Sequence, residues 1–140
     1  PRVSLKVGFF LTDTTEPDRG NFSLVPGSHL QNNLESPEGA VPVLVSPGTA
    51  VFFDRRLWHA AGHNHSTITR KVLFYGYSYR WLRPRDDMTV EHMMNLCSPI
   101  RRQLLGASVT GGMGYTSPRE EDVPLRTWLR KHGGEEAVAP

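Results

Sequence analysis

A histidine and an arginine, His59 and Arg70, stand on either side of one predicted turn. His59 ends an apolar stretch with strand character, and Arg70 comes just before the next such stretch. Because both residues adjoin the same turn, both side chains can point into one cavity. An imidazole can ligate a metal ion or make a structural hydrogen bond, and a guanidinium can bind an anion or remain in solvent. The spacing alone leaves these alternatives open.

Four other residues have reactive side chains, but each has a simpler structural explanation. His63 and His65 lie in a predicted turn, and we expect exposed loop histidines there rather than a second metal site. His29 ends a Pro-Gly-Ser-His segment, where we expect a structural turn, with a role at a pocket mouth as the alternative. Cys97 is the single cysteine, so an internal disulfide and a Cys-x-x-Cys pair are excluded, and we expect it to fill apolar space.

One further arginine and a set of aromatic residues depend on how the strands are arranged. If residues 50–59 form one strand, Arg55 shares a face with His59, and an inward arginine would require a carboxylate partner that the sequence does not identify. The aromatic residues of the next strand are expected mainly to pack in the core, although one of them could line a substrate cavity: Phe74, Tyr75, Tyr77, Tyr79 and Trp81.

The elements that must position these residues are predicted strands followed by short helices. Apolar and β-branched patterning predicts five strands, near residues 3–12, 22–25, 41–45, 50–59 and 71–79. Pro42 confines its strand to an edge or to an entry position. Helix start and stop signals predict two or three short helices, from Asp86 or Asp87 to about Leu96, from Ser98 to Gly106, and from Pro124 to Gly133.

The composition limits the classes of partner. The 140 residues hold 16 Lys and Arg against 14 Asp and Glu, so no strongly basic surface for nucleic acid is predicted. The apolar fraction of 38% is enough for one packed core, and no apolar run approaches the ~20 residues that span a bilayer. We therefore expect no nucleic-acid or membrane partner. A single cysteine favours a reducing, cytoplasmic location, and the oligomeric state is not predicted.

Four segments, taken in their order along the chain, resemble a known family. Together they resemble the phytanoyl-CoA hydroxylase-like (PhyH) family of Fe(II)/2-oxoglutarate-dependent dioxygenases: Leu11–Gly20, Val25–His29, Pro47–Asp54 and Leu57–Arg70. The resemblance continues more loosely through residues 98–106 and 124–129. It therefore covers nearly the whole chain. Each segment is a weak signal alone, but the ordered set is specific.

The resemblance implies a fold and a division of roles. It implies a mainly β double-stranded β-helix, or jelly roll, with residues 1–83 as the C-terminal part of its core and residues 84–140 as a helical extension that packs on the same domain. By the same resemblance, His59 is an iron ligand and Arg70 binds the distal carboxylate of 2-oxoglutarate. Fe(II) is the implied cofactor, and 2-oxoglutarate and O₂ are the implied cosubstrates.

One part of the family pattern is missing from this chain. The family takes its other two metal ligands from an H-x-D or H-x-E motif, and none of the six histidines has an acidic residue two positions later. The chain also begins with Pro1 and has five predicted strands where the family core has eight. We therefore expect the C-terminal portion of a longer enzyme, incomplete at its N-terminus and inactive alone, with the other ligands upstream of Pro1.

The resemblance implies that the intact protein hydroxylates an unactivated C–H bond of a small molecule. A 2-oxoglutarate-dependent halogenase of the same fold is an alternative, because replacement of the carboxylate ligand would open a site for halide. A non-catalytic, degenerate jelly-roll binding module is a second alternative, supported by the missing H-x-D motif. Family members act on varied substrates, so the substrate is not predicted.

Overall fold

The computed structural model describes residues 3–33, 35–82, 90–111 and 117–138. Internal contacts divide the chain into two compact units, Pro1–Ser78 and Tyr79–Pro140. The boundary expected between residues 83 and 84 lies outside the described residues. Within the described residues, no helix has the length and apolar character needed to cross a membrane.

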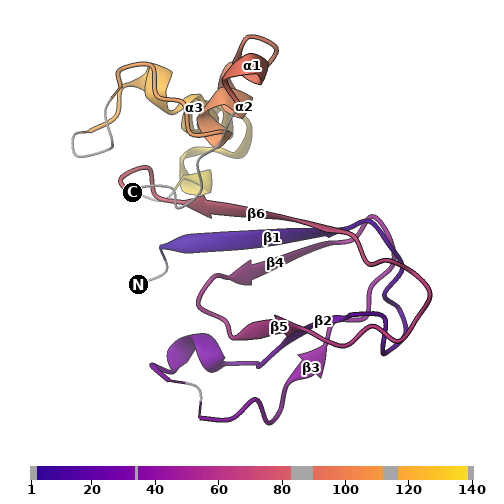
Figure 1. The fold of residues 1–140 in the computed structure, drawn as a ribbon. Coiled ribbons are helices and arrows are strands. Elements are labelled where there is room, and N and C mark those ends of the chain that lie inside the picture. Colours follow the sequence, from indigo (N-terminus) through magenta and orange to yellow (C-terminus); the bar gives the residue numbers. More distant parts are fainter. Residues whose placement is uncertain (1–2, 34, 83–89, 112–116, 139–140) are drawn as a thin grey trace. The chain divides into compact units, whose positions relative to one another are not determined.

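The first unit contains two small antiparallel sheets, shown in Figure 1. One has the order β4-β1-β6, with β1 (Ser4–Phe10) between β4 (Ala50–Asp54) and β6 (Val72–Ser78). The other has the order β3-β2-β5, with β2 (Phe22–Leu24) between β3 (Val41–Pro42) and β5 (His59–Ala61). Pro42 thus lies in an edge strand, as expected. Its missing N–H interrupts no hydrogen bonds between interior strands there.

Aromatic rings join the two sheets through one core. Phe10 of β1, Phe22 of β2 and Phe53 of β4 are all buried and form one cluster. The ring centroids of Phe22 and Phe53 are 5.0 Å apart, and those of Phe22 and Phe10 are 6.5 Å apart. Since Phe22 belongs to one sheet and the other two residues to the second sheet, the sheets face each other. Alternation along each strand then decides which side chains enter the space between the sheets.

The strand predicted over residues 50–59 is wrong in one respect. The structure divides it into β4 and β5, which belong to different sheets, because a turn follows Asp54. The carboxylate of Asp54 accepts hydrogen bonds from the backbone N and the guanidinium of Arg56, and the N–H of Leu57 donates to the carbonyl of Asp54. Such a side-chain bond to the backbone two residues later favours a turn over a strand.

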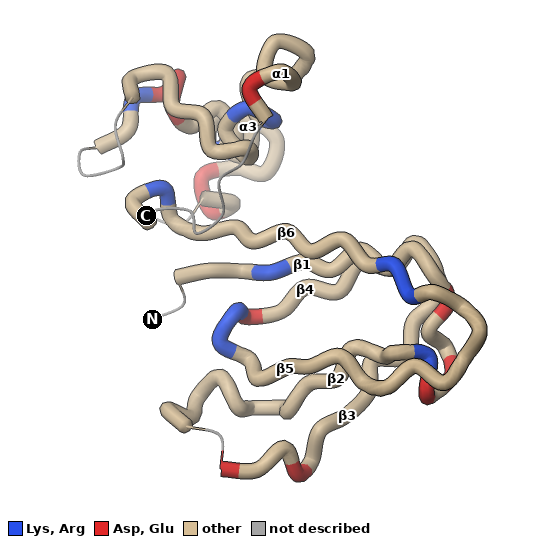
Figure 2. The backbone as a smooth tube through the Cα atoms, in the orientation of Figure 1, with Lys and Arg blue, Asp and Glu red and all other residues tan. Residues whose placement is uncertain are grey.

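This turn also corrects the expectation for Arg55. Arg55 lies in the turn and is exposed, so it does not share a strand face with His59 and needs no buried carboxylate partner. Figure 2 shows the basic residues of the segment between β4 and β5, next to the acidic residue that ends β4. The hydrogen bonds from Arg56, reinforced by its charge, hold the pKa of Asp54 well below its ordinary value. The turn therefore carries an ionised carboxylate at neutral pH.

The second unit is helical, as expected. It contains α1 (Glu91–Met94), α2 (Pro99–Leu104) and α3 (Pro124–Gly133), with short 3₁₀ segments at Glu120–Asp122 and Glu135–Ala137. The Ser98 side chain caps α2 by accepting from Arg101 N, and Gly106 follows with a φ of +91°. The start expected for the first helix, at Asp86 or Asp87, lies outside the described residues.

A buried carboxylate organises the loops of this unit. Asp122 is 4% exposed and accepts hydrogen bonds from Thr110 N at 2.9 Å, Thr110 Oγ1 at 2.8 Å, Ser108 Oγ at 3.0 Å and Arg119 N at 3.2 Å. The backbone N–H of Thr110 has the largest effect among these donors. Together they favour the ionised carboxylate and hold the pKa of Asp122 well below its ordinary value. Asp122 thus links the segments on either side of residues 112–116.

We predict that this carboxylate makes the second unit acid-sensitive. Because the pKa of Asp122 is lower in the folded state, its contribution to stability is present above the unfolded value of about 4 and is lost as the pH falls toward the folded value. Asp122→Asn should lower the melting temperature at pH 7 and reduce the loss of stability between about pH 5 and pH 3. Thermal unfolding followed by circular dichroism measures both effects. Glu120→Gln, at an exposed position, is the control; an equal effect there would contradict the assignment.

Candidate functional site

His59 begins β5 and points into the space between the two sheets. In the register of β5 with β2, His59 lies opposite Leu24 and Ala61 lies opposite Phe22. The imidazole packs against the buried rings of Phe22 and Phe53, with centroid distances of 5.5 Å and 5.0 Å. The β3-β2-β5 sheet therefore presents the imidazole toward the opposite sheet.

A backbone hydrogen bond determines which nitrogen of His59 is available. Nδ1 lies 2.5 Å from the carbonyl oxygen of Leu57. Because a carbonyl can only accept, Nδ1 carries the hydrogen and the lone pair is on Nε2. A hydrogen bond of this kind orients histidine ligands in metal sites. When the ring carries a single hydrogen, the lone pair of His59 that can bind a metal ion is therefore the one on Nε2.

The Pro-Gly-Ser-His turn holds the start of β5 in place. Ser28 is fully buried, and its hydroxyl accepts from the N–H of Trp58 at 2.9 Å and donates to the carbonyl of Val25 at 2.7 Å. The N–H of Val25 in turn donates to the carbonyl of Trp58 at 3.0 Å. These bonds fix the residue that immediately precedes His59. The structural turn expected around His29 is thus present, as the 3₁₀ segment Ser28–Leu30.

We predict that Ser28→Ala destabilises the protein by about 1–3 kcal/mol, because it leaves the buried N–H of Trp58 and the carbonyl of Val25 without this partner. Urea unfolding of the variant and the parent protein measures the difference. Ser46→Ala, at an exposed position, is the matched control and should change stability by less than about 0.5 kcal/mol. Equal stability of Ser28→Ala and the parent protein would contradict this role.

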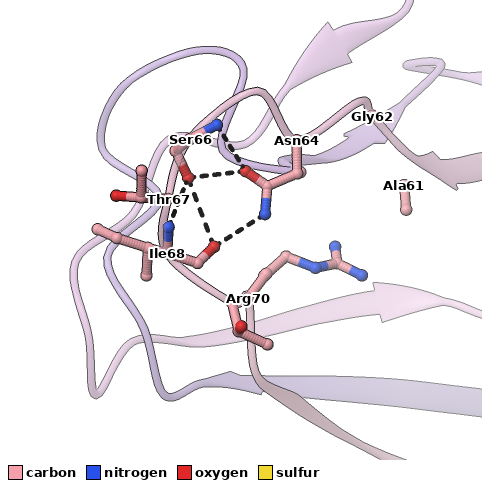
Figure 3. A pocket seen from close by; sticks show the side chains of 9 residues that line it. Ala61, Gly62, Asn64, Ser66, Thr67, Ile68 and Arg70 are labelled. Carbon is pink, nitrogen blue, oxygen red and sulfur yellow. Dashed lines mark hydrogen bonds between the residues drawn. The ribbon is translucent and has the colours of Figure 1, made fainter.

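Arg70 lies at the wall of a pocket of ≈ 420 Å³ whose lining includes Gly20, Ala61, Asn64 and Ser66 (Figure 3). Its guanidinium extends toward the side of the pocket where Ala61 lies. The Nη1 atom is buried and has no hydrogen-bond partner among the described residues. A buried guanidinium nitrogen without a partner is costly unless a ligand supplies an acceptor. A bound anion could supply the acceptor that Nη1 of Arg70 lacks.

A glycine in the neighbouring loop makes room for this side chain. Gly20 has a φ of +67°, which L side chains rarely adopt, and a Cβ there would lie 3.5 Å from Cδ of Arg70 and 3.3 Å from Cβ of Asn64. The backbone N–H of Gly20 donates to the carbonyl of His63 at 2.9 Å. The loop before β2 is thus joined closely to the loop after β5.

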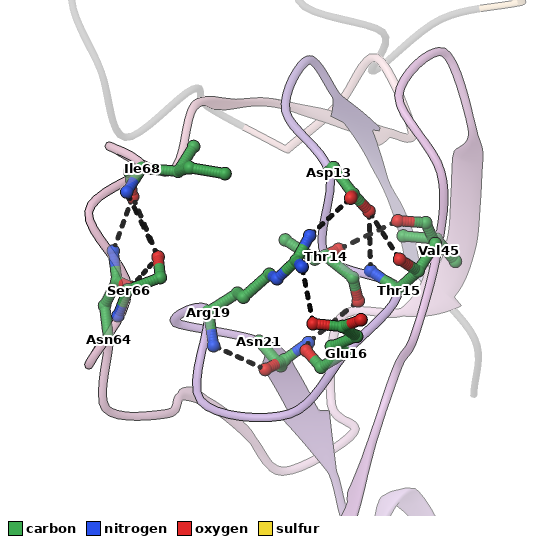
Figure 4. Close-up of polar contacts among 10 residues, drawn as sticks. All are labelled: Asp13, Thr14, Thr15, Glu16, Arg19, Asn21, Val45, Asn64, Ser66 and Ile68. Carbon is green, nitrogen blue, oxygen red and sulfur yellow. Dashed lines mark hydrogen bonds and ion pairs between the residues drawn. The ribbon is translucent and has the colours of Figure 1, made fainter.

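The side chains of Asn64 and Ser66 at the pocket rim have hydrogen-bond partners within the protein. The Asn64 side chain accepts from Ser66 N and Oγ and donates to the carbonyl of Ile68, as Figures 3 and 4 show. In the adjoining loop, the guanidinium of Arg19 pairs with the carboxylates of Asp13 and Glu16 (Figure 4). Arg70 differs from these groups, because its Nη1 has no acceptor among the described residues.

The two principal candidates are connected through Ala61. Ala61 lines the pocket of Arg70, and it is two residues after His59 on the same strand, so both face the same side of the sheet. The Nε2 lone pair of His59 can serve as one ligand of an iron site, and the guanidinium of Arg70 can bind a carboxylate. Within the described residues, no group of three or more His, Cys, Asp or Glu could hold a metal ion.

The structure also places the remaining candidate residues. His63 and His65 are exposed, with stacked rings 5.9 Å apart, and Cys97 is half-buried and free. His29 has a buried Nδ1 without a hydrogen-bond partner in the described part of the chain, and its charge contributes to the lowered pKa of Asp54. Phe74 contacts the Phe22 and Phe53 rings at 6.0 Å and 6.4 Å but is 45% exposed. Tyr75, Tyr79 and Trp81 are exposed as well, so the expectation that these aromatic residues pack mainly in the core is wrong.

Sequence reasoning missed Lys6. This lysine is in the middle of β1, and its Nζ lies 3.4 Å from Nε2 of His59 on the opposite sheet. The signal was present in the alternation of β1, since Lys6 is four residues before the buried Phe10 and therefore lies on the same face.

The chain is similar in sequence to known proteins. A sequence model of the phytanoyl-CoA dioxygenase (PhyH) family matches residues 1–72. Dioxygenase trt7 of Aspergillus terreus is 31% identical over 117 residues, which are 76% of this chain and 38% of that protein. Dioxygenase andF of Emericella variicolor is 30% identical over 112 residues, with 76% and 39% covered. The chain thus spans less than two fifths of the length of these relatives.

Solved structures show the same fold. AviO1 from Streptomyces viridochromogenes matches with a TM-score of 0.53 and 33% identity over 60% of this chain and 40% of that protein. HygX from Streptomyces hygroscopicus, crystallised with nickel and 2-oxoglutarate, matches with a TM-score of 0.51 and 24% identity over 54% and 36%. The expected jelly-roll fold is confirmed. The chain belongs to the phytanoyl-CoA dioxygenase (PhyH) family.

Proposed function

We propose that this chain is part of an Fe(II)/2-oxoglutarate-dependent dioxygenase that hydroxylates an unactivated C–H bond of a small molecule. The observation that carries the proposal is the guanidinium of Arg70, whose buried Nη1 has no partner among the described residues. Arg70 and Ala61 line the same pocket, and Ala61 belongs to the same strand as His59. Membership of a dioxygenase family supports the reaction class.

Each of the two residues has a role in binding. Arg70 would hold the distal carboxylate of 2-oxoglutarate, because a guanidinium can donate two parallel charge-assisted hydrogen bonds to one carboxylate. His59 would ligate the metal through Nε2, while Leu57 keeps the hydrogen on Nδ1. When bound, iron would supply the activation of O₂, with 2-oxoglutarate oxidised to succinate and CO₂.

Two aromatic rings would cover one side of the metal ligand. The buried rings of Phe22 and Phe53 pack on the imidazole of His59, and they leave little space for solvent on that side. A low-polarity wall also strengthens the electrostatic interactions of the bound anion. The chain would thus help to orient the cosubstrate.

The activity is a proposal for the whole protein. The described residues hold no group of three potential ligands, and the sequence contains no H-x-D or H-x-E motif. We propose that the other two ligands come from outside these 140 residues. If the protein is instead a binding module without activity, the following experiment should detect no succinate formation.

The test is succinate formation by the full-length protein with Fe(II), 2-oxoglutarate and O₂. Succinate formation should exceed that of a metal-free control prepared with chelator. Binding of 2-oxoglutarate is measured in parallel by anaerobic titration of the metal-loaded protein. If the protein contains an H-x-D or H-x-E motif yet neither binds nor decarboxylates 2-oxoglutarate, the proposed function is wrong.

A further inference from the structure

Lys6 places a positive charge on the inner face of the first unit. It lies in β1, the central strand of its sheet, paired with Phe53 of β4 and Gly76 of β6. Its side chain is half-buried and extends from the same face as Phe10, toward the opposite sheet. Figure 2 shows this basic position within β1. A lysine at the centre of a strand and on its inner face requires an explanation.

The contact of Lys6 is with the nitrogen proposed to bind the metal. Nζ donates toward Nε2 of His59 at 3.4 Å, because the other nitrogen of the ring is engaged by Leu57. A metal ion on Nε2 would lie about 2.1 Å from it and would use the same lone pair. The ammonium cannot keep this hydrogen bond once the metal is bound. It then needs another acceptor in the same place.

The described residues offer Lys6 no such acceptor of opposite charge. No carboxylate among them forms an ion pair with Nζ. The neighbouring position on β6 is Gly76, and a Cβ built there would meet no atom within 4 Å. The inner face beside Lys6 therefore has open space as well as an unmatched charge. An anionic ligand can enter this space without displacing a side chain of β6.

We propose that Lys6 binds the carboxylate of 2-oxoglutarate that lies next to the metal. This inference rests on the proposed function, and it gives each end of the dianion its own cation, with Arg70 at the far end and Lys6 at the near end. The role is one of binding and orientation. It requires a positive charge at position 6 and does not require proton transfer.

The test compares Lys6→Met and Lys6→Arg in the full-length, metal-loaded protein. Anaerobic titration, followed by the visible charge-transfer absorption of the metal complex, measures the dissociation constant of 2-oxoglutarate. Loss of a charge-assisted hydrogen bond predicts that Lys6→Met weakens this binding by about tenfold to a hundredfold. Lys6→Arg keeps the charge and should bind closer to the parent protein. Lys71→Met, at an exposed position, is the control and should have no effect.

A second ligand distinguishes the two ends. 2-Oxobutyrate has the near carboxylate and the keto group but lacks the far carboxylate, so Lys6→Met should weaken its binding as much as that of 2-oxoglutarate, and Arg70→Leu should not. Unchanged 2-oxoglutarate binding in Lys6→Met would overturn the inference. So would a loss confined to metal affinity, which would place Lys6 beside a protein ligand instead. If the parent protein itself fails to bind 2-oxoglutarate, the proposed function fails before this inference is reached.

Discussion

Full-length protein carrying His59→Ala should lose its iron. The 2.5 Å contact of Nδ1 with the carbonyl of Leu57 leaves Nε2 of His59 as the ring nitrogen that we propose as the metal ligand. Substitution of residues that only support a metal ligand costs roughly 10–100-fold in affinity. Removal of the ligand itself should therefore exceed about a hundredfold. Metal content after desalting, measured by mass spectrometry, gives the result directly.

The control for this variant is His63→Ala, at an exposed position in the following loop. It should retain iron at the level of the parent protein. Circular dichroism should show that both variants are folded. Equal iron content in His59→Ala and the parent protein would contradict the ligand assignment, because a metal site would then exist without this imidazole.

The second large effect is expected for Arg70→Leu. This variant removes the guanidinium whose Nη1 is buried and unpartnered in the described part of the protein. Two charge-assisted hydrogen bonds to one carboxylate should disappear, so the dissociation constant of 2-oxoglutarate should rise by about a hundredfold or more. Metal affinity should change little, because Arg70 is not proposed as a ligand. Anaerobic titration with 2-oxoglutarate and metal analysis on the same samples separate the two properties.

The informative result is a loss of 2-oxoglutarate binding without a loss of metal affinity. Arg101→Leu, at an exposed position in α2, is the control and should bind 2-oxoglutarate normally. A parallel loss of metal and of 2-oxoglutarate in Arg70→Leu would indicate general damage to the site and would refute the specific role of the guanidinium.

The strands with the clearest alternation could be predicted from the sequence. Residues 3–12 and 71–79 combine apolar, β-branched and aromatic residues, and the structure forms β1 and β6 within these ranges. The helix caps at Ser98 and Pro99 were equally readable, since a hydroxyl before a proline satisfies backbone donors locally. These signals depend on residues that are near one another in the chain.

The break between β4 and β5 could not be predicted in the same way. The stretch from Ala50 to His59 is largely apolar, and only the Asp54 side chain, by bonding to Arg56 N, interrupts it. This local bond competes with strand pairing, and the sequence does not show which of them prevails. The consequence was a wrong interpretation of Arg55, which lies in the turn and not on the face of His59.

The contacts within the site could not be predicted from the sequence either. Lys6 and His59 are 53 residues apart, and their contact depends on how two sheets face each other. The same is true of Ser28, which bonds to Trp58 across 30 residues. Whether Arg70 has a partner is a property of its surroundings in space. The family resemblance indicated His59 and Arg70, but it did not indicate these supporting residues.

The most direct measurement is a crystal structure of the full-length protein with Mn(II) in place of iron and with 2-oxoglutarate, grown without O₂. The account predicts Nε2 of His59 on the metal, and the far carboxylate of 2-oxoglutarate within about 2.7–2.9 Å of the guanidinium nitrogens of Arg70. A metal bound without His59, or a far carboxylate held by groups other than Arg70, would contradict it.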